Sequence, residues 1–314
     1  MESPQSIKKR LKSVSNIGKI TKAMELVAAT KMRKSQEIAL ASRPYAFAAL
    51  DFLATISSMN QELPKLFEIR KVKKVLFVLV SSDKGLAGAF NSSVFRKFEQ
   101  HSKIDKEQWK QEEKVYLAVG EKAYNYLSKK GLNVVKKFVS VGDYTTLEQV
   151  HPITDFIIKG YLAEEWDRVV IVSTHFRSAL KQEPHVRRVL PIDFDHIKET
   201  VEQIIPERGK FADLIKEQHI SFIPEKSKIT EYLVEPSAGE VLNKLADHLF
   251  FIQFYHLILE ANASEHSARR MAMKTASDNA SELGEELNLQ YNKSRQSKIT
   301  TEISEISAGA EALN

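Results

Sequence analysis

A glycine-containing loop in the middle of the chain holds the residues with the clearest potential for chemistry. Residues 81–91 read Ser-Ser-Asp-Lys-Gly-Leu-Ala-Gly-Ala-Phe-Asn and follow a short apolar run. A loop of this kind between a strand and a helix is a common place for phosphate binding. The loop matches neither G-x-x-x-x-G-K-[ST] nor G-x-G-x-x-G, so it supports a nucleotide site only weakly. The alternative is a tight turn that lets the next helix pack close to a sheet.

The nine histidines are the next candidates for chemistry. His248, His256 and His266 share one helical stretch, but it contains no H-E-x-x-H and no set of carboxylates typical of a zinc site. We expect them to pack or to lie on a polar face. His175 follows a predicted strand, where functional residues of such sheets often lie, but no partner for it is identifiable. The sequence therefore predicts no catalytic residues, no metal ligands and no cofactor.

The composition limits the classes of protein that fit. The 314 residues, 43% of them hydrophobic, suffice for one or two domains with a core. The chain has no cysteine, which excludes disulfides, thiolate chemistry and zinc held by cysteine. No apolar run reaches about 18 residues, so we expect no transmembrane helix. The basic N-terminus lacks the apolar core of a secretory signal.

The elements that position the loop lie between residues 70 and 235. Apolar runs predict buried strands at 75–80, 114–120 and 168–173, a weaker strand at 133–139 and an edge strand at 186–191. Helical patterns cover 121–130 and 195–205. Strands that alternate with helices indicate βαβ units in a mostly parallel sheet.

The C-terminal stretch, 241–313, has a helical period without any proline. Ser237 and Glu240 predict a capping box at its start. An unbroken helix of this length would measure about 100 Å, too long for a single-domain core to cover. It must therefore lie against another long helix or inside a partner. Its predicted packing positions are Val241, Leu245, Leu249, Ile252, Leu259, Ala276, Ala280, Leu283, Leu287 and Tyr291.

The N-terminal segment predicts that second helix. Ser3 and Pro4 are a typical helix start, and Pro44 is expected to kink the helix or to end its first part. Residues 1–34 carry nine Lys and Arg against two acids, so the helix suits nucleic acid, anionic lipid, an acidic protein surface or solvent. No nucleic-acid-binding motif accompanies the charge. The predicted packing positions are Ile7, Leu11, Val14, Ile17, Ile20, Met24 and Val27.

Three segments together carry a family resemblance. Residues 20–31 read ITKAMELVAATK, residues 82–91 read SDKGLAGAFN, and residues 299–312 read ITTEISEISAGAEA. In these segments and in their order, the chain resembles the gamma subunits of F-type ATP synthases. It departs from the family at residues 193–228, which are longer and more charged than expected, and it lacks the cysteine-bearing insert of the chloroplast members.

The resemblance implies an α/β fold with a long antiparallel coiled coil of the two terminal helices (1–58 and 237–313) and a Rossmann-like α/β domain (70–235). It implies a central-stalk rotor that couples ion flow through the membrane c-ring to ATP synthesis or hydrolysis at the alpha/beta hexamer, without an active site of its own. The implied partners are the alpha, beta and epsilon subunits and the c-ring. The implied location is the cytoplasmic face of the bacterial plasma membrane, touched only through the c-ring; the matrix face of an organelle is the alternative.

The resemblance also assigns contact residues, for which plain helix packing or a solvated face is the alternative. Those implied to contact or couple to the hexamer are Met24, Arg269, Arg295, Gln296, Thr300 and Glu302, with Met24 and Arg269 close to each other. Those implied to meet the c-ring are Tyr232, Leu233, Val234 and Glu235. Two other functions remain open: a nucleotide-dependent enzyme that uses residues 81–91, and a basic scaffold that binds nucleic acid or lipid. Neither explains two long terminal helices that carry the family's motifs.

Overall fold

A computed structural model describes residues 3–59, 64–108, 112–142, 145–193 and 235–311. Tertiary contacts divide the chain into two compact units. One contains residues 29–268, and the other contains residues 1–28 together with 269–314. The predicted helix at 195–205 lies outside the described residues. Within the described residues, no helix combines the length and the apolar character that crossing a bilayer requires.

The unit of residues 29–268 is built on a five-stranded sheet in the order β3-β2-β1-β4-β5. β1 pairs in parallel with both β2 and β4, β3 is parallel to β2, and β5 is antiparallel to β4. The parallel part has the strand order of half a Rossmann fold. All five predicted strands are confirmed, with bounds β1 Lys74–Val80, β2 Glu113–Val119, β3 Val134–Phe138, β4 Arg168–Phe176 and β5 Gln182–Leu190.

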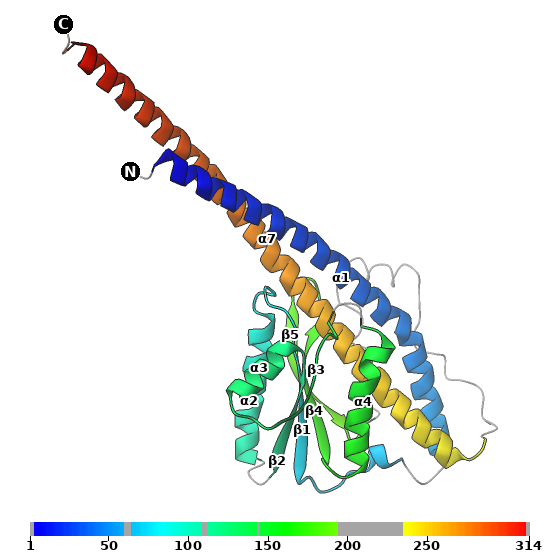
Figure 1. Cartoon of the computed structure of the whole chain (residues 1–314). Coiled ribbons are helices and arrows are strands. Elements are labelled where there is room, and N and C mark those ends of the chain that lie inside the picture. The colour runs from blue at the N-terminus through cyan, green and yellow to red at the C-terminus, as the bar shows by residue number, and fades with distance from the viewer. Residues whose placement is uncertain (1–2, 60–63, 109–111, 143–144, 194–234, 312–314) are drawn as a thin grey trace. The chain divides into compact units, whose positions relative to one another are not determined.

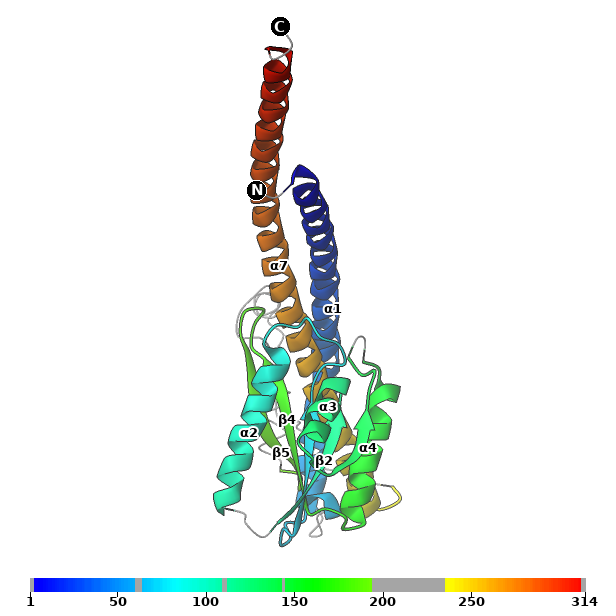
Figure 2. The same ribbon diagram turned by 60° about the vertical axis from the view of Figure 1, so that its left-hand side comes forward.

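Helices cover both faces of this sheet. α2 (Phe90–Gln108) and α3 (Glu121–Lys129) lie on one face, while α4 (Leu147–Leu162) and the first part of α7 lie on the other (Figures 1 and 2). The alternating apolar residues of β1 explain both layers, because a strand directs successive side chains to opposite faces. Residues 75, 77 and 79 pack with α2 and α3, whereas residues 76, 78 and 80 join the core with α4 and α7. The short helix η1 (Lys65–Phe67) adds to the second core.

The two terminal helices are the longest elements. α1 runs from Pro4 to Met59, and α7 runs from Ala238 to Glu311. The predicted caps are present: the Ser6 amide donates to Ser3 Oγ at 3.3 Å, and the Glu240 amide donates to Ser237 Oγ at 3.3 Å. α1 continues past Pro44, so this proline does not end the helix. The 74 residues of α7 correspond to about 110 Å of helix.

The second unit is an antiparallel pair made of residues 4–28 of α1 and residues 269–311 of α7 (Figure 1). A Cβ atom added at Gly18 would lie 3.4 Å from the Cβ of Ala280, so the helices approach closely where both residues are small. From this crossing, Pro4 lies opposite about residue 294 of α7 in an antiparallel pair. The remainder of α7 therefore extends beyond the start of α1, as Figure 2 also shows.

The prediction that Ile17, Ile20 and Val27 belong to the packed face of α1 is wrong. These side chains are 54%, 60% and 55% exposed, while Ile7 and the smaller Ala28 are buried. Thr21 and Glu25 are also buried there, and Leu283 of α7 is exposed while Leu287 is buried. The interface uses small and polar residues, so hydrophobicity alone selects the wrong face of the helix.

Candidate functional site

The loop at residues 81–91 is tied together by its own side chains. The Ser82 amide donates to Asn91 Oδ1 at 3.1 Å, and Asn91 Nδ2 donates to Ser82 Oγ at 2.7 Å. Ser82 Oγ also donates to the Lys84 carbonyl at 2.7 Å. These bonds join the end of β1 to the first turn of α2. Ser82 and Asn91 therefore close the loop as a turn.

Asp83 joins this loop to two further elements. Its carboxylate accepts the Glu121 amide at 3.0 Å, at the start of α3, and the Ser140 amide at 2.9 Å, after β3. Ser81 Oγ accepts the Ala123 amide at 2.6 Å. A helix N-terminus attracts phosphate through such free amides, and here a carboxylate and a hydroxyl occupy them. These bonds tie the loop to the start of α3 and to the connection after β3, as the tight-turn interpretation expects; the amides involved belong to α3 and not to α2, the helix that follows the loop.

Gly120 explains how these elements come so close. It has φ 96°, and a Cβ atom there would lie 2.2 Å from the Ser81 carbonyl oxygen. No L side chain fits such a position without moving the backbone. The contact brings the end of β1 against the start of α3 and puts Ser81 within reach of its amides.

The histidines have structural partners. His175 lies within β4, because that strand continues to Phe176 instead of ending before it as predicted. Its Nδ1 donates to Glu260 Oε2 at 3.0 Å, and both side chains are buried. His266 Nε2 donates to the Gly142 carbonyl at 3.0 Å, and His256 is fully buried. In the part of the chain that the structure describes, no three His, Asp or Glu side chains are grouped so as to hold a metal ion.

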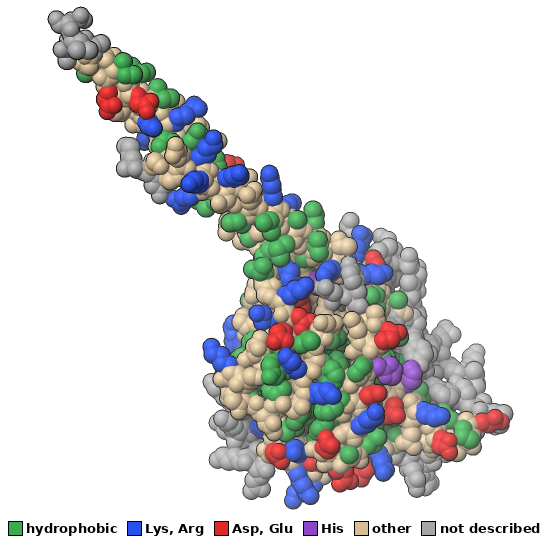
Figure 3. Space-filling view, viewed as in Figure 1, with side chains coloured by type: hydrophobic (Ala, Val, Ile, Leu, Met, Phe, Trp, Pro, Cys, Tyr) green, Lys and Arg blue, Asp and Glu red, His purple; other side chains and the backbone are tan. Residues whose placement is uncertain are grey.

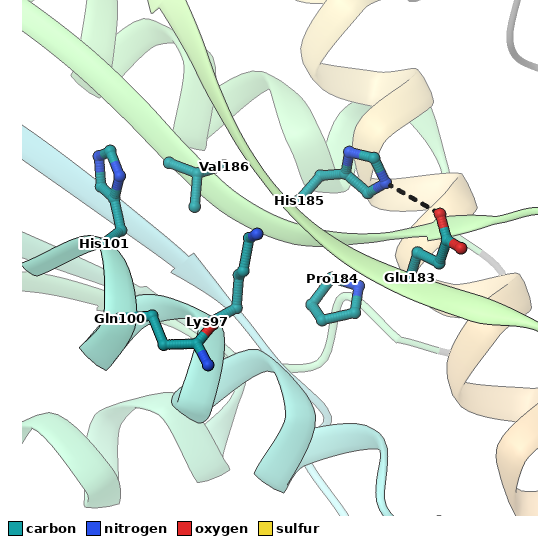
Figure 4. Close-up of a pocket in the computed structure, with 7 residues that line it drawn as sticks. All are labelled: Lys97, Gln100, His101, Glu183, Pro184, His185 and Val186. Atoms are coloured by element: carbon teal, nitrogen blue, oxygen red, sulfur yellow. Dashed lines mark ion pairs between the residues drawn. The ribbon is translucent and has the colours of Figure 1, made fainter. Parts of the chain in front are cut away.

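A cavity of about 690 Å³ lies between α2 and β5 (Figure 4). Burial lowers the pKa of His185, and its Nε2 lies 3.7 Å from Glu183 Oε2. The Glu183 carboxylate also pairs with Lys181 at 2.8 Å and with Arg177 at 2.7 Å. The lining residues are Lys97, Gln100, His101, Glu183, Pro184, His185 and Val186.

Two of the coupling residues implied by the resemblance, Met24 and Arg269, lie near the end of the helix pair at which residue 28 of α1 and residue 269 of α7 bound the unit. Both are half-buried, and both belong to the unit of residues 1–28 and 269–314. Since Ala280 lies opposite Gly18, residue 274 lies opposite Met24, and Arg269 is about 8 Å further along the axis. That separation is within the length of an arginine side chain, so the register is compatible with the expected proximity.

The other implied hexamer contacts lie on the extended part of α7. Arg295, Gln296, Thr300 and Glu302 are all exposed there. Thr300 Oγ1 donates to the Gln296 carbonyl at 3.0 Å, and Glu302 lies 3.5 Å from Lys298. Of the implied c-ring contacts, Glu235 is exposed just before α7. Tyr232, Leu233 and Val234 lie outside the described residues.

An apolar stripe on the same part of α7 was not predicted. Ile299, Ile303 and Ile306 are 47%, 59% and 72% exposed. Their spacing of four and three residues places them on one helix face. The signal in the sequence was this spacing, in a segment that extends beyond the start of α1. Lys and Arg side chains are scattered between apolar and other side chains on the visible face of the helix pair (Figure 3).

Comparison with known proteins identifies the family. A family model described as ATP synthase matches residues 3–313. The ATP synthase gamma chains of Roseiflexus castenholzii and Herpetosiphon aurantiacus are each 37% identical to this chain. The alignments cover all of this chain and 99% and 100% of those two relatives. The chain belongs to the ATP synthase gamma chain family. It is thus a gamma subunit of ATP synthase, and the relatives named here are bacterial.

Solved structures support the same fold for this gamma chain. A chain from the rotor of the Euglena gracilis mitochondrial ATP synthase matches with a TM-score of 0.60 at 18% identity, covering 94% of this chain and 98% of that one. A chain from the central stalk and c-ring structure of the Tetrahymena thermophila enzyme matches with a TM-score of 0.56 at 23% identity, covering 82% and 99%. At these identities the likeness shows the gamma fold: a five-stranded sheet with long N- and C-terminal helices.

Proposed function

We propose that this gamma chain is the central-stalk rotor of an F-type ATP synthase, which couples ion flow through a c-ring to catalysis at an alpha/beta hexamer. The observation that supports this most directly is the extended part of α7, which has no helix opposite it among the described residues and carries an exposed isoleucine stripe. Helices in proteins gain most of their stability from packing rather than from propensity, so the extended part, residues 295–311, is expected to need a packing partner. Three exposed isoleucines on one face further indicate a partner that encloses it.

The hexamer is the proposed partner of this tip. Arg295, Gln296, Thr300 and Glu302 supply polar groups beside the stripe, and small residues follow at 307–310. Small side chains suit a surface that turns against its neighbour, because they present little to interlock. We propose that Met24 and Arg269 face the acidic lever segment of a beta subunit.

The opposite end of the rotor is proposed to meet the epsilon subunit and the c-ring, the latter through residues 232–235. The matched Euglena gracilis chain comes from a rotor, and the matched Tetrahymena thermophila chain comes from a central stalk with a c-ring. The proposed location is the cytoplasmic face of a bacterial plasma membrane, since the relatives are bacterial; the matrix face of an organelle is the alternative. The membrane contact is proposed to run only through the c-ring.

We propose no active site on this chain and assign catalysis to the hexamer. The functional parts are the two helical segments, 1–58 and 237–313, and the α/β domain at 70–235. Paired helices supply the stiffness that torque transmission needs.

Substitution at the stripe tests this function. Ile303→Glu places a charge in the face that the hexamer is proposed to enclose, and burying an unpaired charge is costly. Leu180→Glu is the matched control, because Leu180 is 79% exposed in the other unit. We expect Ile303→Glu to lower co-purification with the alpha and beta subunits, or the torque of the complex that forms, while Leu180→Glu leaves both unchanged. Equal behaviour of the two variants would contradict the proposal.

A further inference from the structure

One stretch of α7 is buried on every face although many of its residues are polar. Residues 249–267 are all buried and lie in the unit that contains the sheet. Apolar residues of this stretch pack in the core with β1, β2, β4 and α4. Buried polar groups need partners in fixed directions. The buried polar residues of this stretch are Gln253, His256, Glu260, Asn262, Ser264, Glu265, His266 and Ser267.

A first set of hydrogen bonds joins α7 to the connection after β3. Tyr255 Oη donates to the Thr145 carbonyl at 3.0 Å, and His266 Nε2 donates to the Gly142 carbonyl at 3.0 Å. Asn262 Nδ2 donates to the Val141 carbonyl at 2.9 Å and to Thr145 Oγ1 at 2.5 Å. Successive helix residues are about 100° apart, so these three donors lie within about 40° of one another on α7.

A second set joins another face of α7 to the end of β4 and the turn that follows. Glu260 accepts from His175 Nδ1 at 3.0 Å. Ser267 Oγ donates to the Ala179 carbonyl at 2.7 Å and accepts from Gln182 Nε2 at 3.3 Å. Glu260 and Ser267 lie about 130° around the helix from the first set. The helix is therefore held by directional bonds on two different sides.

The segment that the first set bonds to α7 is itself bonded to the α/β domain. The connection after β3 is itself fixed where the Ser140 amide donates to Asp83, and Asp83 also accepts from the start of α3. Four of these acceptors from the two sets are backbone carbonyls, at residues 141, 142, 145 and 179. Apolar attraction is non-directional, so it opposes rotation or sliding of a helix less specifically than hydrogen bonds do. Bonds to backbone carbonyls would be broken by either movement, leaving buried polar groups without partners.

We propose that these two sets of bonds lock α7 against rotation and sliding relative to the α/β domain, and that Asn262 and His266 are positioning residues for torque transmission. The inference rests on the proposed rotor function. Torque that enters through the domain must pass into α7, and the buried polar stretch is where the domain holds the helix from two sides. The lock makes the domain and the shaft turn as one body.

The test measures the torsional stiffness of the stalk in the fully assembled complex. The hexamer is immobilised, hydrolysis is stalled, and the angular fluctuation of a rod attached on the c-ring side is recorded. The double variant Asn262→Leu/His266→Leu removes three of the four bonds in the first set. We expect its angular variance to rise by less than twofold, because the lock loses about half of its bonds while the flexibility of the rest of the stalk is unchanged. The matched control is His266→Gln, which keeps a donor at this position, and we expect wild-type variance for it.

The yield of complex measures assembly, and the angular variance of the assembled complex measures stiffness. A side chain needed only for folding lowers the yield of complex, but the complexes that form have wild-type variance. If the double variant does not assemble, His266→Leu and Ser267→Ala decide the matter, with increased variance expected for each. Wild-type variance in all assembled Leu and Ala variants overturns the inference. A wild-type complex in which the chain does not rotate overturns the rotor function instead.

Discussion

Replacing Asp83 with alanine tests whether the loop at residues 81–91 has a structural role. In that role, which we call a bracket, Asp83 holds the loop to the start of α3 and to the connection after β3. The Asp83 carboxylate accepts two backbone amides, from Glu121 at 3.0 Å and from Ser140 at 2.9 Å. Hydrogen bonds to a charged group contribute about 1.5–3 kcal/mol each when buried. Asp83 is half-buried, so water replaces part of what is lost. We therefore expect Asp83→Ala to lower the free energy of unfolding by about 2 kcal/mol in total.

Differential scanning calorimetry measures this loss. For a unit of this size, about 2 kcal/mol corresponds to a fall in Tm of about 6 °C. Asp83→Asn keeps one carbonyl oxygen as an acceptor, and we expect about half of that effect. Lys84→Ala is the matched control, because its side chain is exposed beside Asp83, and we expect an unchanged Tm.

Hydrogen exchange locates the effect. The Glu121 and Ser140 amides are expected to exchange faster in Asp83→Ala, because each loses its acceptor. An unchanged Tm with unchanged exchange would refute the role given to Asp83. So would ATP binding by the wild-type chain that disappears in Asp83→Ala, since the loop would then be a nucleotide site and not a bracket.

Three further predictions concern the α/β domain. Gly160→Ala should destabilise the domain by at least about 2 kcal/mol in a urea titration, because the new Cβ would lie 2.0 Å from Trp166 Cζ2. The control Gly85→Ala should have a small effect in the same titration, because Gly85 has open space around it. Burial lowers the pKa of His185, so the unfolded chain takes up a proton there before the folded chain does, and stability should fall as the pH drops below about 6.5. Tm measured at several pH values should therefore fall less steeply with decreasing pH in His185→Gln. Burial raises the pKa of Tyr126 to about 12, so it should ionise after free tyrosine in an ultraviolet titration, with stability falling as pH rises from about 10 to about 12.

Three of the strands, β1, β2 and β4, were predictable because each is a short apolar run buried in the sheet. The residues of β1 and β4 are almost all buried, which is typical of parallel strands covered on both faces. The helix starts at Ser3 and Ser237 were also readable from their caps. The three family segments then identified the chain, although no single one of them specified a function.

The helix faces were harder to predict. Ile17 and Ile20 suggested the packed face of α1, but the close approach at Gly18 uses small residues and leaves the isoleucines exposed. α4 was not identified, since Pro152 interrupts its pattern. The capping box of Thr146 and Gln149 was the signal that marks its start. The local sequence pattern shows which residues are apolar, but the face of a helix that becomes buried depends on the element that packs against it.

The candidate site was predictable only in part. The exposed positions of Arg295 and Glu302 agree with a contact surface, but their roles came from the family resemblance and stay predictions. The bonds from Asn262 and His266 could not be predicted, because their partners lie more than a hundred residues away in the chain. Such contacts depend on how the sheet and α7 come together.

Direct observation of rotation tests the rotor function most clearly. The chain has no cysteine, so Leu180→Cys at an exposed position gives a single site for a fluorescent or gold label. With the alpha/beta hexamer fixed to a surface and ATP supplied, the label is expected to turn continuously in one direction, and to stop when ATP is removed. A label that stays fixed relative to a hydrolysing hexamer would contradict the rotor function.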